Sequence, residues 1–356
     1  MNHIPVLLNE VLNIVGACGT RPGACHAPLQ NKTIVDCTFG AGGYSRAFLE
    51  RGANVIAFDR DSSVASAADA LAREFPGKFT FINKPFSELG KIFSTDTNDV
   101  GANNYSPLQS VFSIYAIVFD LGVSSMQIDT PERGFSFRFD APLDMRMGQI
   151  PLLWRGVAEG DGVVYPTSET WVNHPRPATS RAAPPTEGNL TAAELIKNSS
   201  VAELTRILRD YGDVKKASAI ARAMKEKLPQ TTFGLRDLIF NPHDIAPVFQ
   251  ALRIAVNDEL GEIETALAAV PALLAPGGIC AAVTFHSLED RLVKNIFREW
   301  TTTPGDPRLP APNDCTGGKF SAPTKFRLLK TSTPGDAELS ANPRAHSAHL
   351  RAVIKS

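Results

Sequence analysis

Residues 36–45 read Asp-Cys-Thr-Phe-Gly-Ala-Gly-Gly-Tyr-Ser, and they follow a short apolar run that begins at Thr33. A second apolar run, residues 54–58, ends on Asp59. A strand that leads into a glycine-rich turn and a helix, followed by a strand that ends in an acid, is typical of a cradle for a nucleotide-like cofactor. The glycines let the backbone approach the ligand, and the acid binds ribose hydroxyls.

The spacing of the glycines narrows the choice of ligand. Gly40, Gly42 and Gly43 form the pattern G-x-G-G, which differs from the dinucleotide pattern G-x-G-x-x-G, and Asp36 lies just before the turn. Pyrophosphate prefers free amides at a helix N-terminus without a carboxylate beside them. A carboxylate suits a ligand with a cationic amino acid end, such as S-adenosylmethionine. An ordinary tight turn is the alternative, but the acid after the next strand favours a cofactor.

Composition sets the limits on the remaining possibilities. The chain has 356 residues, 43% of them hydrophobic, which is enough for two domains. It has no run of about 18 apolar residues and no signal-like N-terminus, so we expect a cytoplasmic protein without a membrane partner. A net charge of −1 argues against a general nucleic-acid coat. The five cysteines are scattered, so we expect no metal site; Cys18, Cys25 and His26 remain possible ligands, but loop thiols are the simpler interpretation.

The first third of the chain alternates between the patterns of strands and helices. Strands are predicted over residues 33–37, 54–59, 79–83 and 115–121, with helices over 43–51 and 62–75 between them. This alternation predicts an α/β fold with a parallel, doubly wound sheet. Asp36, Asp59 and Asp120 all fall at the carboxyl ends of predicted strands. Cofactors bind at that edge of such sheets.

The alternation then stops and later resumes, which predicts an insertion. We assign residues 1–135 and 241–356 to a sheet domain, the latter with a basic C-terminal tail, and 136–240 to a small helical domain. Within the insertion, residues 151–189 hold six prolines and no clear period, which indicates a flexible segment. Capping boxes at Thr191 and Ser200 start two helices. A single long helix is predicted over residues 246–269; Asn257 and Asp258 in its middle are either a structural pair or part of a site.

Eight motifs in order resemble one family across nearly the whole chain, the bacterial 16S small-subunit ribosomal RNA (cytosine-N4)-methyltransferases. They are His3-Ile-Pro-Val-Leu-Leu-Asn-Glu10, Asp36-Cys-Thr-Phe-Gly-Ala-Gly-Gly-Tyr-Ser45, Phe58-Asp-Arg-Asp61, Asp120-Leu-Gly-Val-Ser-Ser-Met-Gln127, Arg133-Gly-Phe-Ser-Phe137, Pro142-Leu-Asp-Met-Arg-Met147, Phe249-Gln-Ala-Leu-Arg-Ile-Ala-Val-Asn-Asp-Glu-Leu260 and Thr284-Phe-His-Ser-Leu-Glu-Asp-Arg291.

The resemblance implies a class I, Rossmann-like methyltransferase sheet with an inserted helical domain. It implies S-adenosylmethionine as the methyl donor and a decoding-region cytidine as the acceptor. The expected partner is small-subunit ribosomal RNA in an assembled or assembling subunit, and DNA is not expected. Carried over by motif, the cofactor-binding residues are Gly42, Gly43 and Tyr44 at the methionine end, Asp59 at the ribose, Phe86 at the adenine, and Asp120 with Gln127 completing the pocket.

The chain also departs from the family pattern. Tyr44 stands where histidine is usual, and Pro247 and His346 stand where the family has arginines. Val214 replaces an acid, and residues 151–189 have no counterpart in the pattern. The missing arginines bear on RNA docking and domain contacts more than on the cofactor pocket.

The exocyclic amine of cytosine is a poor nucleophile, so the acceptor of its proton is the main chemical question. Asp120 is one candidate, and the hydroxyls of Ser124 and Ser125 are others. His286 could accept a proton or contact RNA; alternatively, its segment is a helix N-cap with Ser287 as the cap and Glu289 and Asp290 facing the dipole.

Arg133, Phe135 and Phe137 form an aromatic, arginine-bearing loop that could hold a flipped base, although alternating phenylalanines are more often the buried face of a strand. Two other functions stay open: a DNA or small-molecule methyltransferase on the same sheet, and a cofactor-binding ribosome assembly factor with weak catalysis.

Overall fold

A computed structural model describes residues 5–16, 29–93, 113–148, 190–302 and 326–356. The expected flexible segment 151–189 lies outside these residues, as do Cys18, Cys25 and His26. The chain divides into two compact units. One, the sheet unit, comprises Met1–Gly122 and Glu262–Ser356; the other, the helical unit, comprises Val123–Gly261. The helical unit begins earlier and ends later in the sequence than the insertion expected over residues 136–240. None of the helices in the described residues is long and apolar enough to cross a bilayer.

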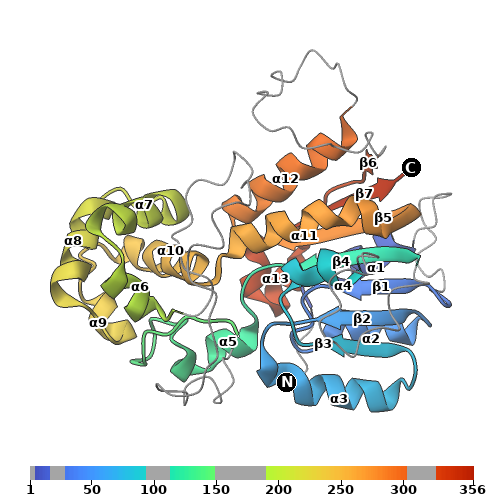
Figure 1. Cartoon of the computed structure of the whole chain (residues 1–356), viewed down its shortest axis with the longest axis horizontal. Coiled ribbons are helices and arrows are strands. Elements are labelled where there is room, and N and C mark those ends of the chain that lie inside the picture. Colours follow the sequence, from blue (N-terminus) through green and yellow to red (C-terminus); the bar gives the residue numbers. More distant parts are fainter. Residues whose placement is uncertain (1–4, 17–28, 94–112, 149–189, 303–325) are drawn as a thin grey trace, which may run out of the picture. The chain divides into compact units, whose positions relative to one another are not determined.

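The sheet unit is built on seven strands in the order β3-β2-β1-β4-β5-β7-β6 (Figure 1). The strands are β1 (Thr33–Asp36), β2 (Asn54–Phe58), β3 (Phe79–Ile82), β4 (Ile114–Asp120), β5 (Leu274–Thr284), β6 (Phe326–Leu328) and β7 (His349–Lys355). The first five in this order pair in parallel, and β7 pairs antiparallel with both β5 and β6. The predicted α/β class and class I sheet are confirmed. The strand order reverses between β1 and β4, which is where such sheets bind ligands.

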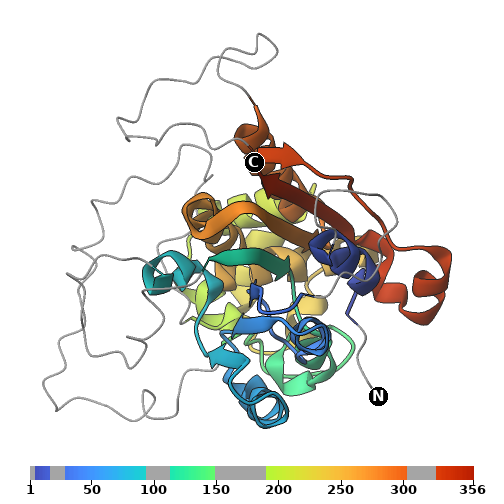
Figure 2. The same ribbon diagram turned by 90° about the vertical axis from the view of Figure 1, so that its right-hand side faces the viewer.

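Helices cover both faces of this sheet, which explains why its central strands β1, β2 and β4 are almost continuously apolar and buried. Helices α1 (Leu8–Gly16) and α2 (Gly43–Glu50) lie on one side, and α4 (Leu89–Phe93) and α11 (Glu259–Leu273) lie on the other (Figure 2). The remaining helices of the unit are α3 (Ala65–Glu74), α12 (Ser287–Thr301) and α13 (Asp336–Ala341). Alternate residues of β1, β2 and β4 pack with α1, α2 and α3 in one buried apolar cluster.

The helical unit has a core of its own. It contains α5 (Ser125–Asp129), α6 (Ala192–Asn198), α7 (Val201–Gly212), α8 (Ala217–Lys227), α9 (Thr232–Arg236) and α10 (Ile245–Asn257). The apolar stripes of α6 to α10 meet in one cluster that includes Leu204, Leu208 and Leu252. Both predicted capping boxes are present: Thr191 pairs with Glu194 at the start of α6, and Ser200 pairs with Glu203 at the start of α7.

The prediction of a single long helix over residues 246–269 is wrong. Asp258 has a φ of 47° and ends α10, and α11 begins at the next residue. Aspartate tolerates this left-handed conformation better than most residues, so the helix breaks here despite continuous apolar periodicity. Asn257 and Asp258 are not a buried pair either, because only Asn257 is buried.

Asn257 is a structural residue of the helical unit. Its Oδ1 accepts the backbone N–H of Met147 at 2.8 Å, and its Nδ2 donates to the carbonyl of Met145 at 2.7 Å. These bonds tie the Pro142-Leu-Asp-Met-Arg-Met147 loop to the end of α10. The side chain is 4% exposed, so water cannot replace these contacts.

We predict that Asn257→Ala destabilises the helical unit. The substitution leaves a buried N–H and a buried carbonyl without partners, and each such group costs about 1–3 kcal/mol. Urea denaturation followed by circular dichroism measures the loss. Glu226→Ala on α8 removes only a surface pair with Lys227 and should change stability by less than about 0.5 kcal/mol. Equal denaturation midpoints for the two variants would contradict the assignment.

Candidate active site

The glycine-rich turn connects β1 to α2 in a conformation that only glycine adopts readily. Gly40 has a φ of 52° and Gly42 a φ of 80°. A Cβ atom on Gly42 would lie 2.9 Å from the ring of Phe39. The amide of Phe39 donates to the carbonyl of Phe58 at 2.8 Å, so the turn is anchored on β2. Gly42 caps α2, whose first residue is Gly43.

Asp36 is buried next to this turn and hydrogen-bonds to residues of it. Its carboxylate accepts the backbone N–H of Thr38 at 3.1 Å and the hydroxyl of Ser45 at 2.7 Å. Burial raises its pKa above the ordinary value, and these hydrogen bonds act in the opposite direction. The side chain of Asp36 therefore links the end of β1 to the start of α2 through hydrogen bonds. It also places negative charge next to the turn.

Asp59 joins the end of β2 to the same turn. Its Oδ2 accepts the N–H of Gly40 at 2.8 Å, and its Oδ1 accepts the N–H of Asp61 at 2.8 Å. Burial raises the pKa of Asp59 to about 6, while the two backbone donors lower it. Each carboxylate oxygen retains a lone pair for a further donor. The bond to Gly40 links the acid to the glycines directly, which sequence spacing alone does not show.

Asp120 lies at the end of β4 and has a side-chain oxygen that no described residue contacts by a hydrogen bond. Its backbone N–H donates to the hydroxyl of Thr38 at 2.7 Å. Its Oδ1 is buried and has no hydrogen-bond partner among the described residues. Burial, followed by the negative charges of Asp36 and Glu289, holds its pKa well above the usual range. A buried polar atom without a partner is costly, so its persistence indicates a site that a ligand completes.

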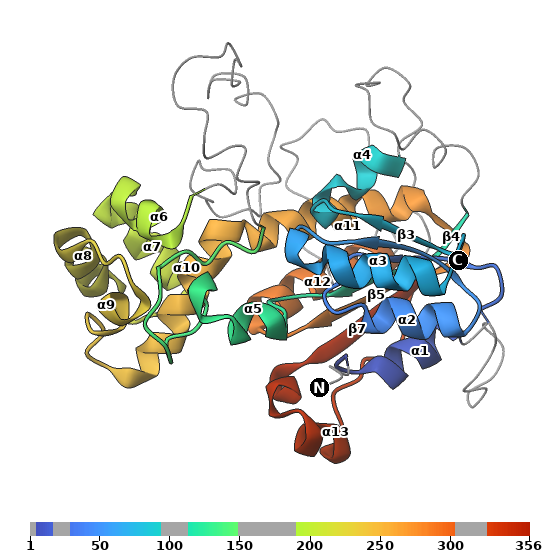
Figure 3. The ribbon, with the colours of Figure 1, turned by 90° about the horizontal axis from the view of Figure 1, so that it is seen from below.

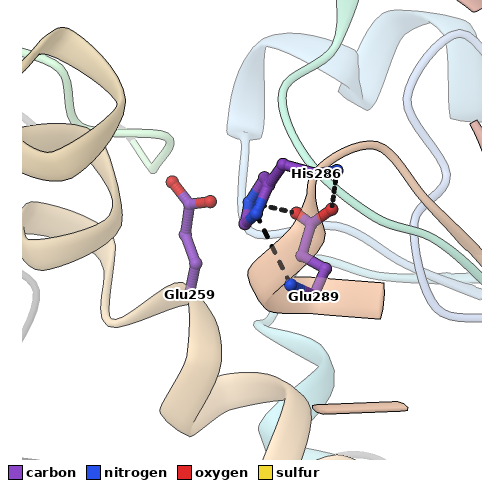
Figure 4. A group of neighbouring side chains, drawn as sticks. All are labelled: Glu259, His286 and Glu289. Atoms are coloured by element: carbon purple, nitrogen blue, oxygen red, sulfur yellow. Dashed lines mark hydrogen bonds and ion pairs between the residues drawn. The ribbon is translucent and has the colours of Figure 1, made fainter. Parts of the chain in front are cut away.

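His286 and Glu289 lie where β5 leads into α12 (Figure 4). The Glu289 side chain is almost fully buried, and its Oε2 accepts the backbone N–H groups of Phe285 at 2.8 Å and His286 at 3.3 Å. The Nδ1 of His286 accepts the N–H of Glu289 at 3.4 Å, so a neutral ring carries its proton on Nε2, 3.0 Å from Glu289 Oε1. Glu259, also drawn in Figure 4, belongs to the helical unit and pairs there with Arg253 at 2.7 Å.

The expectation that Ser287 caps α12 is wrong, because His286 is the N-cap. Histidine is an uncommon cap, which is why the residue after it was the natural choice from sequence. Glu289 was assigned only to the helix dipole, yet its charge also raises the pKa of Asp120. Its position three residues after the cap fits a capping box, which is the signal that could have identified it.

Tyr44 and Phe86 belong to the sheet unit, as do Asp36, Asp59 and Asp120. Tyr44 is 3% exposed and its hydroxyl donates to the carbonyl of Val6. Phe86 follows β3, is half-buried and meets Phe119 edge-on with ring centroids 5.7 Å apart. The sheet unit thus contains eight of the expected site residues: Asp36, Gly42, Gly43, Tyr44, Asp59, Phe86, Asp120 and His286.

The other expected site residues belong to the helical unit. Ser124 caps α5, whose first residue is Ser125, and forms a capping box with Gln127. The Nε2 of Gln127 donates to the carbonyl of Met147 at 3.4 Å. A guanidinium nitrogen of Arg133 donates to the same carbonyl at 2.7 Å. These polar side chains therefore support the loop that ends at Met147.

The two phenylalanines of the expected base slot have packing contacts. Phe135 lies under the Arg133 guanidinium at 5.9 Å, and Phe137 meets Phe249 edge-on at 5.5 Å. Both are partly buried against the helical core. They do not form a strand, because this segment is a turn between α5 and α6. Phe139, the third of the series, is 51% exposed.

With this geometry in view, comparison with known proteins decides the family. A family model described as the MraW methylase family matches residues 1–152 and 185–356. The chain belongs to this family. The unmatched residues, 153–184, fall within the segment that had no counterpart in the family pattern.

Two relatives illustrate the similarity along the whole chain. A protein of Chelativorans sp. (strain BNC1) is 38% identical over 99% of this chain and 87% of its own length. One of Caulobacter vibrioides is 37% identical over 99% and 96%. Each is named ribosomal RNA small subunit methyltransferase H. Among solved structures, an rRNA methylase of Streptococcus thermophilus has a TM-score of 0.35 at 10% identity over 98% of this chain and 92% of its own, too low for any inference.

Methylases of this family use S-adenosylmethionine as the methyl donor, so the predicted cofactor is confirmed. The residues present fit it. The ring of Phe39 leaves no room for a side chain at Gly42, so the turn keeps its backbone bare of a Cβ at this position. The unpartnered oxygen of Asp120 and the raised pKa values of three acids suit a ligand that brings N–H donors and positive charge.

We predict that Gly42→Ala weakens cofactor binding at least tenfold and destabilises the protein. Gly77→Ala is a matched control, because Gly77 has a φ of 74° but a Cβ added there would meet nothing within 4 Å. Both variants incur the left-handed penalty of about 1–2 kcal/mol, but only Gly42→Ala displaces Phe39. Titration calorimetry and urea denaturation separate the two effects. Identical affinity losses would refute the crowding argument.

Proposed function

We propose that the protein transfers a methyl group from S-adenosylmethionine to the exocyclic N4 amine of a cytidine in the decoding region of 16S ribosomal RNA. The observation that carries the proposal is the buried, unpartnered Oδ1 of Asp120 at the switch point of a methylase sheet. The names of the relatives favour small-subunit ribosomal RNA over DNA or a small molecule. We further propose that the RNA is methylated within an assembled or assembling small subunit.

Asp120 is the group we assign to the amine. When bound, S-adenosylmethionine supplies an electrophilic methyl group and a positive charge. A positive charge beside a buried carboxyl lowers its pKa, which converts Asp120 to the carboxylate. The carboxylate then accepts an N–H of the amine, which keeps the nitrogen lone pair on the nitrogen and orients it for attack. The proton passes to Asp120 as the new C–N bond forms, and the bond between the methyl carbon and the sulfonium sulfur would break to leave a neutral thioether.

His286 has a different role in this proposal. Its Nδ1 already accepts the N–H of Glu289, and a neutral ring carries its proton on Nε2. In this tautomer the side chain is a donor, not a proton acceptor. That donor lies 3.0 Å from Oε1 of Glu289, so we assign His286 to positioning Glu289 beside the acceptor site and Asp120 to proton acceptance.

The remaining assignments follow the contacts of each residue. Asp59 binds the ribose hydroxyls, because each of its oxygens retains a lone pair. Gly42, Gly43 and Tyr44 form the methionine end, and Phe86 lies against the adenine. Asp36 supplies negative charge beneath the turn.

The helical unit is proposed to hold the RNA. Ser124 caps its first helix, α5, which contains Ser125 and Gln127. Arg133, Phe135 and Phe137 keep the adjoining loop in shape through packing and carbonyl contacts.

Mass spectrometry of small-subunit RNA from cells with and without the gene tests substrate and activity together. We expect one N4-methylated cytidine to disappear and to return on complementation. Assembled subunits, naked RNA and DNA offered to the purified protein identify the preferred substrate. Transfer to DNA alone, or an unchanged modification pattern in the deleted strain, would overturn the proposal; the second result would favour an assembly factor.

We predict that Asp120→Asn lowers kcat by about 10²–10⁴-fold, the usual contribution of a general acid or base. Asparagine keeps the size of the side chain but cannot take up the proton. Single-turnover methyl transfer measures the effect, with cofactor affinity measured separately by calorimetry. The exposed Asp69→Asn on α3 is the control and should behave as the wild type. Wild-type turnover by Asp120→Asn would exclude Asp120 as the acceptor.

We predict that cofactor affinity falls as the pH drops below about 6, the pKa of Asp59. The ionised carboxylate accepts the ribose hydroxyls, whereas the protonated form loses acceptor capacity. Below this pKa the contribution of Asp59 should decline by about tenfold per pH unit. Calorimetry across the range, with Asp59→Asn as reference, isolates this group from other acids. A difference between the two proteins that does not vary with pH would contradict the ribose assignment.

A further inference from the structure

The hydroxyl of Tyr44 connects the cofactor turn to the N-terminal segment, residues 5–7. Tyr44 is the second residue of α2 and directly follows the glycines. Its hydroxyl donates to the carbonyl of Val6, and both residues are buried. Burial, with nearby negative charges including that of Glu338, holds the pKa of Tyr44 well above its usual value. The hydroxyl therefore remains a donor at neutral pH, and residues 5–7 fix the start of α2.

This segment is held in a conformation that leucine does not favour. Leu7 has a φ of 54° and is fully buried. The left-handed conformation costs a residue with a Cβ about 1–2 kcal/mol, so a compensating contact must hold it. Its N–H donates to Oε1 of Glu338 at 2.6 Å, and its carbonyl accepts the N–H of Val11 at 3.0 Å. A charge-assisted bond of this length is among the strong ones.

Glu338 comes from the opposite end of the chain, on α13. The next residue, Leu339, packs against the main apolar cluster of the sheet unit. Helix α13 leads into a short turn at residues 343–347 and then into β7, and it lies on the same side of the sheet as α1 (Figure 3). The carboxylate is therefore carried by an element that the sheet anchors.

We propose that Glu338 is a positioning residue for the cofactor site. It holds residues 5–7 through the N–H of Leu7, and these residues hold the first turn of α2 through the carbonyl of Val6 and the hydroxyl of Tyr44. The inference rests on the cofactor role proposed for the glycine turn and not on the RNA substrate. The simpler role for Glu338, satisfying an unpaired N–H near the start of α1, predicts a loss of stability alone.

Steady-state kinetics with full-length protein and small subunits as substrate separate the two roles. We expect Glu338→Ala to raise KM for S-adenosylmethionine about tenfold, equivalent to about 1.4 kcal/mol, with kcat and KM for the subunit unchanged. Glu338→Gln keeps an acceptor oxygen and should restore most of the affinity. Asp336→Ala, an exposed acid on the same helix, is the matched control and should match the wild type.

A double-mutant cycle tests the chain of contacts. Tyr44→Phe removes the other end of it, so Glu338→Ala and Tyr44→Phe should be less than additive in cofactor affinity. Additive effects, or a lower melting temperature of Glu338→Ala without a change in KM, would overturn the proposal. Failure of the wild-type protein to bind S-adenosylmethionine would instead refute the proposed cofactor site.

Discussion

Three carboxyl groups lie at the carboxyl ends of the neighbouring strands β2, β1 and β4, that of Asp36 fully buried and those of Asp59 and Asp120 on half-buried residues, and the site depends on how the protein stabilises them. Asp59, Asp36 and Asp120 each have a raised pKa, and burial is the largest cause in every case. Because the folded protein holds these protons more tightly than the unfolded chain, the free energy of unfolding falls as the pH rises through the raised pKa values. For Asp59 this window runs from 3.8 to about 6.

The three acids differ in what satisfies them. Asp36 accepts hydrogen bonds from Thr38 and Ser45, and Asp59 accepts them from the amides of Gly40 and Asp61. Both acids therefore fix the conformation of the turn and add negative charge to it. Asp120 retains an oxygen without a partner among the described residues. A cationic ligand relieves the shared repulsion, whereas a pyrophosphate would add to it. The charge of the cradle therefore favours a cationic cofactor, and in the proposed mechanism the unpaired oxygen of Asp120 accepts an N–H of the acceptor amine.

Local signals predicted much of this arrangement from the sequence. Strand ends, the glycine turn and both capping boxes depend on residues within a few positions of one another, so their patterns identify them. The break at Asp258 was missed because periodicity continues across it, and only its left-handed backbone reveals it. The cap at His286 and the packing of Phe137 on Phe249 were missed for another reason. They depend on side-chain choices and tertiary contacts that spacing does not encode.

The contact between Leu7 and Glu338 joins residues 331 positions apart, and it has a consequence for biosynthesis. The strands and glycines of the cradle leave the ribosome early, but the residue that secures the N-terminal segment is among the last to be made. At about 5–20 residues per second, roughly 15–60 s of translation separate the two. If Glu338 positions the cradle as proposed, a nascent chain carries an incomplete cradle until synthesis is nearly finished, and cofactor capture is a late event in biosynthesis.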